Sequence, residues 1–255
     1  MASKREIPLP RVLAEGTAIV VSILLAFSID AWWDEQKERA DEQEILLALK
    51  AEFEINRIEA KAVIDHHEES IRRVREFKSM PQDTLESMGT IEYRNLLRAF
   101  AGPRTFDPRR GTVSALISAS KLGVLRDPVL REALMTFITI VEDADEDRYY
   151  MGETSLWVWR EMLSLGGPWQ AIPGSNSPDD CVDANFDRHC YIIEQTSYLP
   201  VVTADELLLI RANSKLMGLI DQDKIHAAHY ASEVNEMLVQ IERIIGRIDS
   251  SLNQH

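Results

Sequence analysis

The stretch VLAEGTAIVVSILLAFSIDAWW, residues 12–33, decides the architecture of this chain. As an α-helix rising 1.5 Å per residue, it would be about 33 Å long, which is enough to cross the hydrocarbon core of a bilayer. Glu15 and Asp30 leave only residues 16–29 free of charge. An uncharged run of that length also fits the core of a signal peptide or a buried helix.

The residues that follow favour a membrane anchor. Trp32 and Trp33 stand where an interfacial aromatic belt would lie. No polar break separates them from the charged helical run DEQKERADEQE, residues 34–44. A small-x-small site over residues 26–28 keeps signal cleavage open as an alternative. We expect a transmembrane helix over residues 12–33.

The flanking charges predict the orientation of this anchor. Lys4, Arg5 and Arg11 lie in the N-terminal stub, residues 1–11, whereas acidic residues dominate the other side. Basic residues collect on the cytoplasmic side of membrane helices. We therefore expect a single-pass protein of the bacterial inner membrane, with the stub in the cytoplasm and residues 34–255 in the periplasm.

One face of the anchor carries small residues at every fourth position, namely Ala14, Ala18, Ser22 and Ala26, and ends at Asp30. Small residues four apart allow another helix backbone to approach closely, which is how helices associate in lipid. An acid at the membrane edge usually faces a partner, water or the interface. The stripe therefore predicts a packing face, although Ala and Ser could simply be common here.

The rest of the chain reads as helical. Apolar residues recur at helical spacing from residue 34 to Met80-Pro81 and predict one long helix, collinear with the anchor. The apolar positions are Ile45, Leu46, Leu49, Phe53, Ile58, Val63, Ile71, Val74 and Phe77. With two further long helices and two shorter ones, and no strand pattern, the expected fold is all-α, an extracytoplasmic antiparallel bundle.

Turn and cap residues set the expected helix boundaries. We expect a break at residues 81–89, a short helix from Thr90, and a helix over residues 112–122 that Gly123 stops. Asp127-Pro128 then opens a helix that runs to residue 165. Residues 203–206, TADE, form a capping box before a final helix over residues 207–248.

An irregular loop, residues 166–202, separates the last two long helices and contains Cys181 and Cys190. Two cysteines nine apart in a Gly-, Ser- and Asp-rich loop predict a disulfide ring, which stabilises by about 2–3 kcal/mol and needs an oxidising compartment. Free thiols, or a metal site with His189, are the alternatives. The latter would fall short of a closed zinc set.

The charge balance excludes one class of partner. With 28 Lys and Arg against 42 Asp and Glu, the net charge is −14, so nucleic-acid phosphates would be repelled. No catalytic or phosphate-binding motif is present, and we expect neither enzyme activity nor a cofactor nor a small-molecule ligand. His226 and His229, near Asp223 and Glu233, form a weak metal candidate.

Three further groups of residues bear on partners. Trp157 and Trp159 lie two apart and cannot both enter one core, so with Trp169 they are candidates for a partner contact. The arginines at 104, 109 and 110 could bind a carboxylate or phosphate, but pairing with nearby acids is the simpler expectation. His66-His67 falls on an expected solvated face.

Three segments together are similar to a group of uncharacterised bacterial single-pass membrane proteins: EGTAIVVSILLAFSIDAWWDEQKER (residues 15–39), LLALKAEFEIN (46–56) and LISASKLGVLRDPVLREAL (116–134). The last contains the characteristic positions Leu116, Gly123, Leu125, Asp127 and Leu130. The resemblance covers the first third well and the middle loosely, and it excludes the cysteine loop. It implies an anchor ending in Trp and a helical domain, and it implies no activity.

Three functions are compatible with these features. The first is a non-catalytic accessory subunit that docks on a larger integral-membrane complex, with respiratory or photosynthetic complexes as candidates. The second is an extracytoplasmic sensory or ligand-binding module, against which stands the shortness of the stub. The third is a metal-dependent enzyme built on His226 and His229.

Overall fold

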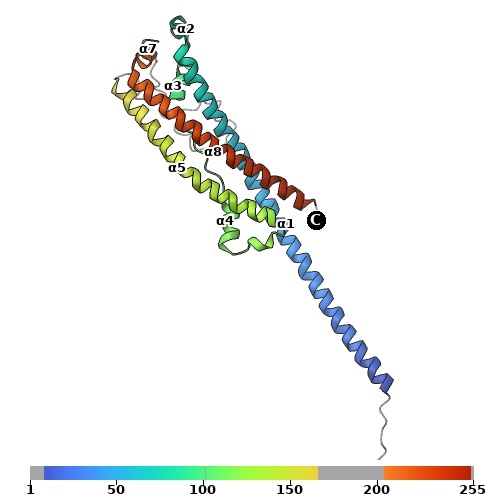
Figure 1. Cartoon of the computed structure of the whole chain (residues 1–255). Helices are drawn as coiled ribbons and strands as arrows, with labels where there is room; N and C mark the ends of the chain where they lie inside the picture. Colours follow the sequence, from blue (N-terminus) through green and yellow to red (C-terminus); the bar gives the residue numbers. More distant parts are fainter. Residues whose placement is uncertain (1–8, 101, 166–203, 254–255) are drawn as a thin grey trace, which may run out of the picture. The chain divides into compact units, whose positions relative to one another are not determined.

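The computed structural model describes residues 9–100, 102–165 and 204–253, and in these residues the chain forms helices and no strand (Figure 1). The elements are α1 (Leu9–Ser79), α2 (Gln82–Ser87), α3 (Thr90–Phe100), α4 (Gly111–Ser118), a 3₁₀ turn η1 (Leu122–Val124), α5 (Pro128–Ser164), α7 (Ala204–Ala212) and α8 (Ser214–Leu252). The chain divides into two compact units. Unit 1 comprises residues 1–52, 110–132 and 245–255, and unit 2 comprises residues 53–109 and 133–244.

In unit 2, α8 runs antiparallel to α1. Lys61 Nζ lies 3.2 Å from Glu242 Oε1, and further along α1 Lys78 pairs with Asp221. The partner's residue number falls on α8 as the residue number rises on α1, so the two helices point in opposite directions. These pairs lie at the surface and contribute little energy.

Contacts between side chains of α8 and residues of α5 show the direction of α5 in the same way. Gln240 Nε2 on α8 donates to the Ala133 carbonyl at 2.7 Å, and Lys215 Nζ lies 2.5 Å from Glu161 Oε2. α8 is therefore antiparallel to α5 as well, and α1 and α5 run parallel to each other. In the sequence, α2, α3 and α4 connect α1 to α5.

The long helices bury residues at alternating steps of three and four, the 3.5-residue period of coiled-coil packing. In unit 2, α1 buries Phe53, Asn56, Ala60, Val63, His67, Ser70, Val74 and Phe77. On α8 the same spacing holds for Leu216, Ile220, Asp223, Ala227, Tyr230, Val234, Met237, Ile241 and Ile244. Hydrophobic burial at this seam is the main stabilising term of the bundle.

Aromatic contacts close the two ends of this core. The Phe77 ring centre lies 4.9 Å from that of Phe100 on α3, and Phe53 packs edge-on against Phe137 of α5 at 5.0 Å. The α3 end is extended by Leu85 of α2, whose side chain is fully buried. The expected break at residues 81–89 therefore contains a short helix.

In unit 1, α4 ends differently from the expectation. Ser120 adopts φ 54°, a left-handed conformation, and its N–H donates to the Ile117 carbonyl at 3.0 Å. The Lys121 N–H donates to the Leu116 carbonyl at 2.8 Å. This pair of bonds is a Schellman motif. The prediction that Gly123 stops this helix is therefore wrong, and Gly123 lies in η1.

Two side-chain caps set the ends of the last long helices. Asp127 Oδ1 accepts the Val129 N–H at 2.9 Å and caps α5, as predicted from the sequence. Asn213 Oδ1 accepts the Leu216 N–H at 3.0 Å and caps α8. The prediction of one continuous final helix is wrong, because this cap starts a new helix after Ala212.

Candidate functional site

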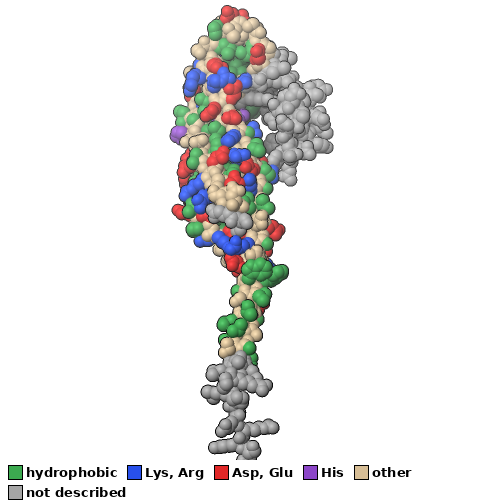
Figure 2. Space-filling model, turned by 90° about the vertical axis from the view of Figure 1, so that its right-hand side faces the viewer, with side chains coloured by type: hydrophobic (Ala, Val, Ile, Leu, Met, Phe, Trp, Pro, Cys, Tyr) green, Lys and Arg blue, Asp and Glu red, His purple; other side chains and the backbone are tan. Residues whose placement is uncertain are grey.

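The most prominent exposed feature is the first part of α1. From Ile19 to Trp33 every large hydrophobic side chain is exposed, with fractions from 48% at Val21 to 67% at Phe27. In Figure 2 hydrophobic side chains crowd this stretch of α1, next to the grey N-terminal residues. Among the described residues, α1 is the one helix long and apolar enough to cross a membrane, and none of that stretch is buried.

The two serine side chains of this stretch are compatible with lipid. Ser22 Oγ donates to the Ala18 carbonyl at 2.7 Å, and Ser28 Oγ donates to the Leu24 carbonyl at 2.8 Å. A hydroxyl without a hydrogen-bond partner is costly in hydrocarbon, so these bonds within the helix remove that cost. Both serines can therefore face lipid or a helix partner without a further donor or acceptor.

The structure places the predicted packing face at the surface. Ala18, Ser22, Ala26 and Asp30 are all exposed on α1, whereas the side chain of Ala14 lies outside the described residues. Trp32 and Trp33, 56% and 67% exposed, have ring centres 6.0 Å apart. Two adjacent exposed indoles suit the position of an aromatic belt at a membrane surface.

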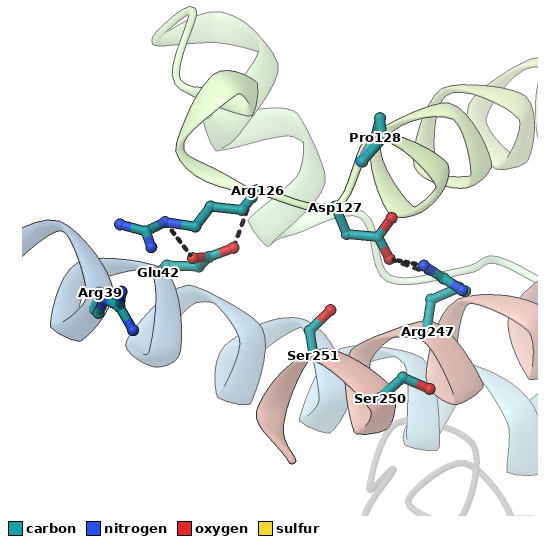
Figure 3. Close-up of a pocket in the computed structure, with 8 residues that line it drawn as sticks. All are labelled: Arg39, Glu42, Arg126, Asp127, Pro128, Arg247, Ser250 and Ser251. Carbon is teal, nitrogen blue, oxygen red and sulfur yellow. Dashed lines mark hydrogen bonds and ion pairs between the residues drawn. The ribbon is translucent and has the colours of Figure 1, made fainter. Parts of the chain in front are cut away.

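Unit 1 contains a second feature, a polar pocket that brings together α1, the residues before α5, and α8 (Figure 3). Its lining residues are Arg39, Glu42, Arg126, Asp127, Pro128, Arg247, Ser250 and Ser251. Glu42, 2% exposed, accepts the Arg126 N–H at 2.6 Å and lies 3.3 Å from Arg126 Nε.

The remaining contacts of this pocket also pair opposite charges. Arg247 contacts Asp127 Oδ2 through Nε at 2.8 Å and through Nη2 at 2.7 Å. Arg39 Nη2 lies 2.6 Å from Glu35 Oε1. Each guanidinium of the pocket therefore already forms an ion pair with a carboxylate. We interpret the pocket as a set of structural ion pairs that link the segments of unit 1.

Unit 2 contains a buried polar network. Lys224 Nζ lies 2.9 Å from Asp223 Oδ2 and donates to Ser70 Oγ at 2.9 Å. Ser155 of α5 donates to Asp223, and Ser70 Oγ donates to the Ala99 carbonyl at 2.9 Å. A buried ion pair rarely adds net stability, but it strongly disfavours any packing that leaves a charge unpaired. The network therefore selects one register of α1, α3, α5 and α8.

Two histidines of α1 bind the connecting segment after α3. His66 Nε2 lies 2.6 Å from the Gly102 carbonyl, and His67 Nε2 lies 2.8 Å from the Arg104 carbonyl. A carbonyl can only accept, so Nε2 carries the proton in both rings. The prediction of a solvated histidine pair is wrong for His67, which is 1% exposed. Burial lowers the pKa of His67 to about 4, so this ring is neutral at neutral pH.

The same segment is held at its far end. Asn56 Nδ2 donates to the Arg109 carbonyl at 2.9 Å, and Asn56 Oδ1 accepts the Arg109 N–H at 2.8 Å. Tyr230 Oη accepts the Phe106 N–H at 2.8 Å. Arg109 Nη2 lies 3.8 Å from Glu59 Oε1, an acid pairing of the kind expected for this arginine.

The other predicted site residues are scattered. Trp157 is 41% exposed on α5, whereas Trp159 packs against the core of unit 2. Trp169, Cys181 and Cys190 lie outside the described residues. His226 stacks on Tyr150 with ring centres 6.1 Å apart. Asp223, proposed above as a neighbouring metal ligand, is instead buried against Lys224.

Within the described residues, no group of three or more His, Cys, Asp or Glu side chains is placed to hold a metal. Comparison with protein-family models, with curated proteins and with solved structures gave no match. Function therefore has to be argued from the exposed surfaces of the molecule.

Proposed function

We propose that this protein is a membrane-anchored, non-catalytic accessory subunit that docks on a larger integral-membrane complex, of the respiratory or photosynthetic type. The observation that carries the proposal is α1 itself, which combines a stretch whose large hydrophobic side chains are all exposed with a stretch that packs in the bundle. Apolar surface left in water costs about 25 cal/mol per Å² relative to the same surface removed from water. Lipid around this stretch would remove that cost.

The orientation and the family are part of the same proposal. The basic stub and the acidic residues after Trp33 support a cytoplasmic N-terminus and a periplasmic domain in the inner membrane. The resemblance to bacterial single-pass proteins supports the same topology. A disulfide between Cys181 and Cys190 would fit the periplasm, and both cysteines would then stay unlabelled after alkylation without reductant.

Docking within the membrane is assigned to the small-residue face of α1. The exposed Ala18, Ser22 and Ala26 would admit a partner helix at close range, and Ser22 needs no partner of its own because it bonds the Ala18 carbonyl. Asp30, at the end of this face, would then meet a partner or the interface.

The test is the double variant Ser22→Leu, Ala26→Leu, purified in mild detergent from native membranes and analysed by mass spectrometry. We expect normal insertion but loss of most of the co-purified complex, because the added bulk separates the helices. The matched control is Val20→Leu, Ala31→Leu, which adds bulk on the opposite face and should retain the complex. If the wild type, the double variant and the control all recover the same membrane complex, this face has no part in docking. If the wild-type protein recovers no membrane complex, the docking function is refuted.

A further inference from the structure

The C-terminal part of α5 packs in the bundle with its inward face and exposes apolar side chains on its outward face. Over residues 149–163, Tyr149, Tyr150, Leu156, Trp157 and Leu163 are between 41% and 63% exposed. Single exposed apolar side chains are ordinary on protein surfaces, but several on consecutive turns of one helix form a patch. The patch extends about 21 Å along the helix.

The spacing of this patch is that of a helix-packing seam. Tyr149, Leu156 and Leu163 recur every seven residues, and the charged residues at 146, 153 and 160 alternate with them at steps of three and four. This is the period at which the inward face of α5 packs in the bundle, for example at Met151, Val158 and Met162. A repeat of seven accepts the side chains of another helix. α5 therefore carries a second, outward seam.

The outward seam is acidic toward its N-terminal end. Glu142 and Glu146 are exposed and Glu153 is half-buried, in line with Tyr149 and Leu156. In the part of the chain that the structure describes, no ion pair engages these three carboxylates. Arg160 lies at the opposite end. A helix lying on this seam would meet apolar side chains and negative charge together.

Further carboxylates of α5 and α8 lie near one another. Burial raises the pKa of Glu233, and the nearby charges of Asp147, Glu236 and Asp143 raise it further, while His229 opposes the rise. These acids repel one another, and a cationic group placed among them would be attracted. Arg148 does not serve this role because it pairs with Asp107 and Asp145 at 3.5 Å and 3.0 Å.

We propose that the outward seam of α5, residues 142–163, is a docking surface for a basic amphipathic helix of the partner complex. Apolar side chains of that helix would pack at Tyr149, Leu156 and Leu163, and its Lys or Arg residues would face Glu146 and Glu153. Gly152 lies on the same stretch of α5, and apart from the neighbouring backbone of α5 itself no described atom lies within 4 Å of the position of a β-carbon there, so the backbone of a docked helix can approach closely.

This inference rests on the proposed function for the source of the helix, but the surface can be tested without the complex. The probe is a synthetic peptide of about five helical turns with Leu on one face and Lys on the other. It is titrated onto the full-length protein in zwitterionic nanodiscs, with empty discs as reference. We expect saturable one-to-one binding that weakens as salt is raised.

One control peptide and three protein variants define the surface. A peptide of the same composition with Leu scattered around the helix should bind at least about tenfold more weakly, as should the variant Leu156→Ser, Trp157→Ala. The variant Glu146→Gln, Glu153→Gln should weaken binding at low salt and flatten the salt dependence. The control Ile58→Ala removes an apolar side chain on α1 that is more exposed, at 65%, than the 41% of Leu156 and Trp157, and it should bind as the wild type does.

Equal binding of the scattered peptide, or no loss in the Leu156→Ser, Trp157→Ala variant, would overturn the inference. A full-length protein that sedimented as a dimer and became a monomer with this variant would assign the seam to a second copy, which also overturns it. Peptide binding as expected, with no membrane complex recovered alongside the wild-type chain, would refute the proposed function and leave the helix-binding surface standing.

Discussion

Two stretches of α1 share one helical backbone and differ in what covers them. Residues 19–33 expose all their large hydrophobic side chains, whereas Phe53, Val63 and Phe77 are between 0% and 2% exposed. Apart from Asp30, the first stretch is uncharged and carries hydrophobic side chains all around the helix, whereas the second is apolar along one seam with charges elsewhere. The distribution of hydrophobic residues around a helix, more than their number, decides whether protein or lipid covers it.

The largest expected difference between the two stretches comes from the same substitution in each. Phe77→Ala removes a fully buried ring that packs on Phe100, and we expect a loss of about 3–5 kcal/mol in the free energy of unfolding. Phe27→Ala removes a ring that is 67% exposed, and we expect less than about 0.5 kcal/mol. Guanidinium unfolding in mild detergent, followed by circular dichroism, measures both. Equal losses would show that Phe27 is covered by protein.

The second prediction concerns pH and His67. Its folded pKa of about 4 lies below the ordinary value of 6.5, because burial disfavours the charged ring. The hydrogen bond to the Arg104 backbone and the charge of Asp223 oppose this shift, while His66 and Lys224 add to it. The stabilising contribution is therefore complete above about pH 6.5 and is lost as the pH falls toward 4. We expect the loss to approach about 3 kcal/mol.

The control for this prediction is His67→Gln, whose amide can still donate to the Arg104 carbonyl but does not titrate. The variant should show a shallower fall in unfolding free energy between about pH 7 and about pH 4.5. An unchanged slope would mean that other groups, such as the carboxylates paired in unit 1, cause the acid instability.

The smallest expected effect compares two serines of α1. Ser70 accepts from Lys224 and donates to the Ala99 carbonyl, so Ser70→Ala leaves a buried ammonium with one partner fewer and should cost about 1–3 kcal/mol. Ser22 bonds only within its own helix, and Ser22→Ala should change the unfolding free energy by less than about 0.5 kcal/mol. Thermal melts of the two variants, measured side by side, test this difference. A larger loss of stability for Ser22→Ala than for Ser70→Ala would contradict the proposal that lipid covers the stretch around Ser22.

Helix boundaries could be predicted wherever one residue supplies the capping chemistry. The end of α1 before Pro81 and the Asp127 cap of α5 were both predictable, because proline and an N-cap carboxylate act locally. The C-terminus of α4 was not, because Ser120 adopts a left-handed conformation that favours glycine. The break at Asn213 was missed because the apolar pattern continues through it.

The core of the bundle could be predicted only in part. Hydrophobicity alone selects Ile58, which is 65% exposed, and overlooks Asn56 and His67, which lie in the seam. A polar side chain is stable in a buried position only when it has a hydrogen-bond partner there. For His67 and Asn56 these partners are backbone groups of residues 104 and 109, which are far away in the sequence. No local pattern carries that information.

The amino-acid sequence by itself determined that the chain is helical and that residues 19–33 need an apolar surrounding, because helical periodicity and uniform hydrophobicity are local properties. Only the tertiary structure decided which polar groups are buried and which apolar residues are not. Asp223 and Lys224 are neutralised by each other and by Ser70, whereas Tyr149 and Leu156 remain exposed because the inward seam of α5 already meets the other helices. Burial is a property of the assembled helices, since each side chain's surroundings come from segments distant in the sequence.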